Sequence, residues 1–63
     1  MTALELKILR LRLGITQGAF AKELGWHIMV LSGLEQGRLT LSNPDAQKIR
    51  EKYPEHFPKG SNL

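Results

Sequence analysis

The stretch from Ile15 to Gly37 constrains the fold of this chain more than any other part of it. It reads ITQGAFAKELGWHIMVLSGLEQG, and its apolar residues recur at helical spacing over residues 17–24 and again over 28–35. Gly25 lies between these segments, at a point where a helix can end in a left-handed residue that glycine adopts without strain. The sequence therefore predicts two short helices joined by a glycine-containing turn, which is the outline of a helix-turn-helix.

Three other residues of this stretch support the prediction. Thr16 precedes the first segment, where its hydroxyl oxygen can accept a hydrogen bond from a free N–H group of the first turn. Ala21 falls in the middle of that segment, where two helices that cross at a steep angle tolerate only a small side chain. Leu31 falls at the point where the second helix should face the first.

Five short motifs here resemble the helix-turn-helix of the Cro/C1-type (XRE) phage repressors. The resemblance extends from about Leu6 to Tyr53 and implies an all-α fold: a compact four-helix, repressor-like domain with helices at about 3–13, 17–24, 28–35 and 44–53. We expect this domain to span residues 1–57 and a flexible C-terminal tail to span 58–63. The motifs are Ile15-Thr16-Gln17, Phe20-Ala21, Leu24-Gly25, Leu31-Ser32 and Leu34-Glu35-Gln36-Gly37.

The ends of the flanking helices carry their own signals. Gly14 follows the apolar-periodic run of residues 3–13 and is predicted to end the first helix. Asn43 is predicted to cap the fourth helix, with Pro44 at its first helical position. Pro54 is predicted to end that helix, since proline cannot continue it.

The first helix has two apolar faces. At about 100° per residue, its leucines at 6, 9 and 13 cluster on one face, which we assign to the core. A second apolar set lies nearly opposite. It either packs on the C-terminal segment of the same chain or forms a dimer or partner surface, and the sequence leaves both alternatives open. This second set is Leu4, Ile8 and Leu11.

The resemblance also implies an ion pair and a DNA-binding surface. Arg10 would pair with Glu35, at least partly buried, and so fix the helix geometry. The third helix would enter the major groove of a double-stranded DNA operator, with Gly33 on its outer face permitting close approach. Residues expected at the surface that binds DNA, or a partner, are Thr16, Gln17, His27, Ile28, Met29, Ser32, Gly33, Arg38 and Thr40.

The chemistry of the third helix leaves a second function open. Base edges are read mainly by hydrogen bonds, whereas this helix offers one hydroxyl group, that of Ser32. Ile28 and Met29 are instead suited to thymine methyl groups or to another protein. Leu39 and Leu41 in the following loop are expected to pack into the core, which leaves Arg38 as the only charged residue of that loop.

Two functions follow from these features. The first is a small DNA-binding transcriptional regulator that binds its operator as a homodimer. The alternative is an antirepressor or repressor modulator that keeps the helix-turn-helix scaffold but binds another regulator, a phage or bacterial repressor protein, through an apolar surface.

Composition limits the other functions that this chain could have. The 63 residues carry a net charge of +3 and no cysteine, which mildly favours a polyanionic partner and removes thiolate metal sites. Neither His27 nor His56 has metal-ligand spacing with an acid, and no nucleophile stands beside a base. We therefore expect no enzyme activity, no cofactor, no metal and no small-molecule substrate. No run spans a bilayer and no signal-peptide pattern is present, so we expect a cytoplasmic protein with no membrane partner.

Overall fold

The computed structural model describes residues 1–57, and within them it contains four α-helices and one short 3-10 helix. The all-α fold predicted from the sequence is confirmed, and three of the four predicted helices have the expected bounds. Residues 58–63, where a flexible tail was predicted, lie outside the described residues. The elements are α1 (Ala3–Leu13), α2 (Gln17–Leu24), α3 (Ile28–Glu35), α4 (Asn43–Lys52) and η1 (Pro54–His56).

The start of α4 differs from its prediction by one residue. Ser42, rather than Asn43, is the N-cap, and its Oγ accepts a hydrogen bond from the backbone N–H of Asp45 at 3.3 Å. Asn43 is therefore the first helical residue and Pro44 the second. Serine and asparagine cap helices about equally well, so two adjacent cap residues leave the helix start undetermined by one position.

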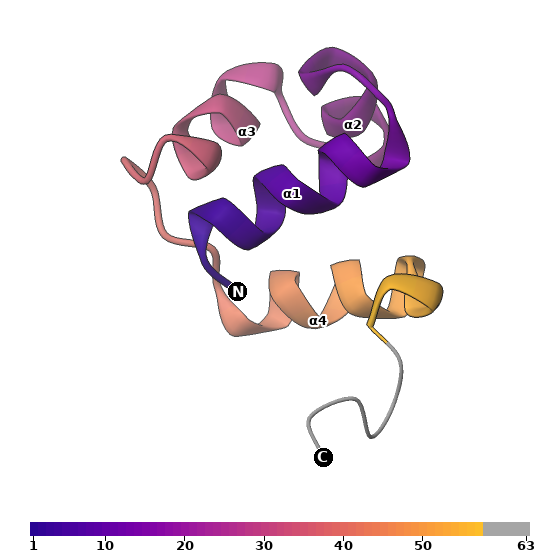
Figure 1. Cartoon of the computed structure of the whole chain (residues 1–63). Coiled ribbons are helices and arrows are strands. Elements are labelled where there is room, and N and C mark those ends of the chain that lie inside the picture. The colour runs from indigo at the N-terminus through magenta and orange to yellow at the C-terminus, as the bar shows by residue number, and fades with distance from the viewer. Residues whose placement is uncertain (58–63) are drawn as a thin grey trace.

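The turn between α2 and α3 forms as predicted. Gly25 has φ +72° and ends α2 in the left-handed conformation, with its N–H directed to the carbonyl oxygens at the end of that helix. The chain then enters α3 within three residues, and α2 and α3 pack on each other. In Figure 1, α2 and α3 lie on one side of α1 and α4 lies on the other.

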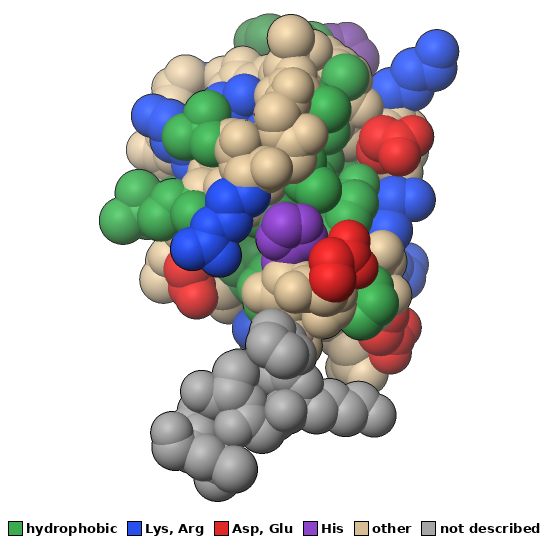
Figure 2. Space-filling model, turned by 45° about the vertical axis from the view of Figure 1, so that its right-hand side comes forward, with side chains coloured by type: hydrophobic (Ala, Val, Ile, Leu, Met, Phe, Trp, Pro, Cys, Tyr) green, Lys and Arg blue, Asp and Glu red, His purple; other side chains and the backbone are tan. Residues whose placement is uncertain are grey.

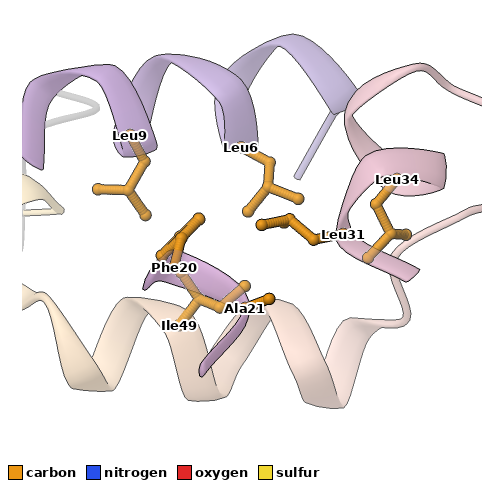
Figure 3. Close-up of a cluster of buried hydrophobic side chains, with 7 residues drawn as sticks. All are labelled: Leu6, Leu9, Phe20, Ala21, Leu31, Leu34 and Ile49. Carbon is orange, nitrogen blue, oxygen red and sulfur yellow. The ribbon is translucent and has the colours of Figure 1, made fainter. Parts of the chain in front are cut away.

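The core is assembled from all four helices. Figure 3 shows leucines of α1 and Ile49 of α4 on opposite sides of this cluster, with side chains of α2 and α3 filling the space between them. Trp26, Leu41 and Tyr53 are partly buried against it, and the core placement predicted for Leu41 is thus met. The fully enclosed cluster is Leu6, Leu9, Phe20, Ala21, Leu31, Leu34 and Ile49.

The outer face of α1 remains exposed. Leu4, Ile8 and Leu11 are 65%, 38% and 59% accessible, so the C-terminal residues that the structure describes, up to Phe57, leave most of this face uncovered. Ile8 alone approaches that segment, since it lines a hollow together with His56 and Phe57. Figure 2 shows one face of the molecule, on which hydrophobic side chains reach the surface between Lys and Arg side chains.

Candidate nucleic-acid interface

Two of the candidate residues cap the helices of the helix-turn-helix. Thr16 Oγ1 accepts a hydrogen bond from the N–H of Ala19 at 3.1 Å, and His27 Nδ1 accepts one from the N–H of Met29 at 3.1 Å. Each cap satisfies one of the backbone donors that a helix start leaves free. These two side chains therefore hold the motif together, whatever else they contact.

A partly buried polar network joins α1, α2 and α3. Arg10 donates from Nε to Glu35 Oε2 at 2.8 Å and from Nη2 to Glu35 Oε1 at 3.1 Å, which forms the ion pair that the resemblance implied. Gln17 Nε2 also donates to Glu35 Oε1, at 3.1 Å, and Arg10 Nη1 donates to the carbonyl oxygen of Ile15 at 3.1 Å. The Glu35 side chain is only 3% exposed.

This network fixes the orientation of α3 relative to α1 and α2. A two-pronged arginine–carboxylate pair admits one relative geometry, and burial of Glu35 prevents water from replacing the arginine. The network also occupies the side-chain amide of Gln17. A phosphate at the start of α2 would therefore be held by backbone N–H groups and not by this side chain. The Gln17 and Ile15 contacts could not be seen in the sequence, because they join residues with no periodic relation.

The outer face of α3 is apolar along its first turn. Ile28, Met29 and Val30 are all exposed, and Met29 is the most exposed at 65%. Ile28 also lies over the start of α2, since a Cβ built on Gly18 would be 3.7 Å from Ile28 Cδ1. The one hydroxyl of this helix, that of Ser32, accepts a hydrogen bond from Gln36 Nε2 at 3.0 Å.

Gly33 and Leu39 occupy different places from those predicted. Gly33 was expected on the outer face of α3, yet it is buried beneath Leu39: a Cβ built there would lie 2.9 Å from Leu39 Cδ1. Leu39 was expected in the core, yet it is 48% exposed and lies on α3 instead. The open backbone that would let DNA approach at Gly33 is therefore covered.

The turn that ends α3 explains both differences. Gly37 adopts φ +80°, its N–H donates to the Leu34 carbonyl at 3.2 Å, and the Arg38 N–H donates to the Gly33 carbonyl at 2.9 Å. This pair of bonds is a Schellman motif, which reverses the chain back over the last turn of the helix. Leu39 follows directly, so its side chain falls on Gly33. Gly37 after an apolar helix is the sequence signal that could have predicted this reversal.

Arg38 and Thr40 are exposed, as expected for residues that contact a partner. Arg38 forms no ion pair within residues 1–57. Together with Met29, Gly33 and Leu39 it lines a surface hollow of about 250 Å³ between α3 and the following loop. The structure thus brings Met29, Gly33 and Arg38 together around one hollow, while Ile28 lies over the start of α2.

The same part of the chain offers little for other chemistry. Residues 1–57 hold no group of three or more His, Asp or Glu side chains arranged for a metal ion. None of the helices in that range is long and apolar enough to cross a membrane.

The α2–turn–α3 unit, its buried ion pair and the outward face of α3 define a helix-turn-helix protein, a class that presents one helix to the major groove of DNA. A family model described as a helix-turn-helix domain matches residues 3–53, which covers α1 to the end of α4. The chain therefore belongs to the helix-turn-helix domain family. No curated protein and no solved structure matches the chain.

Proposed function

We propose that this protein is a small DNA-binding transcriptional regulator, similar to a Cro/C1-type phage repressor, with α3 in the major groove. The observation that carries the proposal is the asymmetry of α3. Its inner face is fixed by the core and by the Arg10–Glu35 pair, while Ile28, Met29 and Val30 on its outer face stay exposed. A rigid helix with one free face is what reading a groove requires.

The contacts follow from this placement. Ile28 and Met29 would lie near base edges, and the hydroxyl of Ser32 would be the one neutral donor beside them. The N–H groups that begin α2 and the guanidinium of Arg38 would hold phosphates, with Thr40 as a neutral neighbour. Few charged residues lie along this surface, so the salt dependence of binding should be modest.

Arg38 provides the test of the phosphate contacts. Replacing Arg38 by Ala should weaken binding to all duplexes alike and lower the slope of log affinity against log salt by about one. Arg50 is the matched control, because it is an exposed arginine of α4, outside the helix-turn-helix and the loop after it. An Arg38→Ala slope equal to that of the wild type would remove Arg38 from the phosphate contacts.

The proposed regulator acts as a homodimer that pairs through the outer face of α1. Glu5 and Arg12 lie two turns apart on the same flank of the apolar face formed by Leu4, Ile8 and Leu11. When two such helices pack antiparallel, turning one copy end to end brings Glu5 of each copy opposite Arg12 of the other. Both flanking pairs are then of opposite charge, which favours a second copy as the occupant of this face.

The symmetry of this dimer suits DNA. An antiparallel α1 pair has its two-fold axis perpendicular to α1 and within the interface. A two-fold dimer of this kind presents its two α3 helices symmetrically about that axis. One duplex with two-fold symmetric half-sites would meet both helices.

A second function is favoured by one observation, the three exposed apolar side chains Ile28, Met29 and Leu39 around α3. Under this alternative the protein is an antirepressor or repressor modulator, and its partner is another helix-turn-helix regulator. Met29→Asp should then abolish the complex while circular dichroism shows an intact fold. A complex that survives this substitution would place the partner elsewhere on the surface.

A further inference from the structure

We propose that the hollow between α3 and the loop after it binds the 5-methyl group of a thymine, and that Leu39 reads the operator together with Met29. The inference rests on the proposed function, because it requires α3 in the major groove. It adds a residue from outside α3 to the reading surface and assigns a chemical feature of the DNA to it.

The lining of the hollow fits this ligand. Met29 and Leu39 form apolar walls, and Gly33, over which Leu39 lies, adds no side chain that would fill the hollow. The hollow measures about 250 Å³ and opens to solvent beside Arg38. Thymine is the base that presents an apolar group in the major groove, its C5-methyl. The arginine beside the opening supplies the positive charge that favours a polyanion over an apolar peptide.

Three polar side chains of this surface already take part in hydrogen bonds within the protein, which favours apolar readout. The hydroxyl of Ser32 accepts from Gln36, and His27 Nδ1 accepts from the N–H of Met29. The amide of Gln17 donates to the buried carboxylate of α3. Bidentate recognition of adenine or guanine needs a free amide or guanidinium on the outer face of α3, and this helix supplies neither.

The hollow is formed before any ligand arrives. The carbonyl oxygen of Gly33 accepts hydrogen bonds from the N–H groups of both Arg38 and Leu39, at 2.9 and 3.1 Å. These bonds tie the backbone of Arg38 and Leu39 to α3, so the Leu39 side chain starts from a fixed point beside that helix. A preformed apolar site loses little conformational entropy on binding, which strengthens what one methyl group contributes.

The experiment compares thymine with deoxyuridine, which lacks only the methyl group. A duplex recovered from a random pool is remade with deoxyuridine at each thymine in turn, and its affinity for the wild-type protein is measured. We expect about a fourfold loss at one position of each half-site, the factor that corresponds to about 0.8 kcal/mol for one buried methyl group.

Two variants and a control connect this loss to the hollow. Leu39→Ala removes one wall, and Gly33→Ala places a Cβ 2.9 Å from the present position of Leu39 Cδ1, so the Leu39 side chain must shift and change the shape of the hollow. Both variants should bind the thymine and deoxyuridine duplexes about equally. Val30→Ala is the control, because Val30 is an exposed apolar residue of α3 that does not line the hollow, and it should keep the wild-type ratio. Circular dichroism verifies that each variant is folded.

The possible outcomes separate this inference from the proposed function. Sequence-selective binding with no deoxyuridine effect at any position would overturn the inference and leave the DNA-binding function in place. A methyl effect that persists in Leu39→Ala would overturn the assignment to this hollow. A folded wild-type protein that binds no duplex would overturn the proposed function, and the inference with it.

Discussion

Removing Arg10 tests how strongly the polar network determines the fold. In Arg10→Met the carboxylate of Glu35, 3% exposed, would keep one hydrogen-bond donor, the amide of Gln17. A buried charge without its ionic partner costs about 3–5 kcal/mol. A chain of this length has a total stability of roughly 3–9 kcal/mol, from about 0.05–0.15 kcal/mol per residue. The substitution should therefore remove a third or more of the free energy of unfolding.

The double variant separates the charge effect from lost packing. Arg10→Met combined with Glu35→Leu removes both charges and fills similar volume, and such replacements of buried pairs are often neutral or stabilising. The double variant should consequently be more stable than Arg10→Met alone by about 3 kcal/mol. The reason is that the large cost belongs to the orphaned carboxylate and not to the loss of the pair itself.

Urea denaturation followed by circular dichroism measures both effects, with the slope m compared across variants to confirm an unchanged unfolding transition. Arg50→Met is the control: it removes an exposed arginine of α4 and should change stability by less than about 0.5 kcal/mol. The reasoning is refuted if Arg10→Met costs less than about 1 kcal/mol, or if the double variant is no more stable than Arg10→Met.

Three more predictions concern the rest of the domain. The buried hydroxyl of Tyr53 makes no hydrogen bond within residues 1–57, so Tyr53→Phe should stabilise the protein by about 1 kcal/mol in thermal unfolding, and a lower melting temperature would contradict this. Burial also raises the pKa of Tyr53 above its ordinary 10.0. The stability of the wild type should therefore be intact below pH 10 and fall as pH rises through the raised pKa. If Tyr53→Phe lost stability over the same pH range by the same amount, the effect would not belong to Tyr53. In sedimentation velocity, the Arg12→Glu and Glu5→Arg variants should each be monomeric, because each substitution places like charges opposite one another across the α1 pair. A mixture of the two variants restores opposite charges and should dimerise. If the mixture stays monomeric while both proteins are folded, the α1 dimer is contradicted.

The helices could be predicted because their signals are local. Apolar residues at helical spacing, Thr16 before α2 and Gly25 after it define these segments without knowledge of tertiary contacts. The exception shows the limit of such signals. Ser42 and Asn43 are equally good caps, and choosing between them depends on how the loop from α3 enters α4.

The candidate interface was predicted less well, because its details depend on a chain reversal. Periodicity assigns Gly33 to the outer face of α3, and that assignment is geometrically sound for an isolated helix. It fails because the turn at Gly37 returns the chain over α3 and places Leu39 on Gly33. The identity of the residue that covers a helix face is set by the loop, which helical periodicity does not describe.

The polar network shows a similar division. The Arg10–Glu35 pair followed from resemblance to known repressors and could not have been derived from spacing, since 25 positions separate the two residues. The contribution of Gln17, which had been expected at the surface that binds DNA or a partner, follows only from the three-dimensional arrangement. The exposure of the outer face of α1 likewise required the structure, because the sequence allowed either of two coverings for it.

The most direct test of the proposed function is binding of the full chain to a random pool of labelled duplexes at ~50 mM and ~200 mM salt. If α3 reads DNA, the protein binds at the lower salt, binding weakens at the higher salt, and an enriched sequence with two-fold symmetry can be recovered from the pool. A protein that is folded by circular dichroism but binds no duplex at the lower salt would contradict this account. The exposed apolar residues around α3 would then be a surface for another protein, and the partner regulator would be the next object of search.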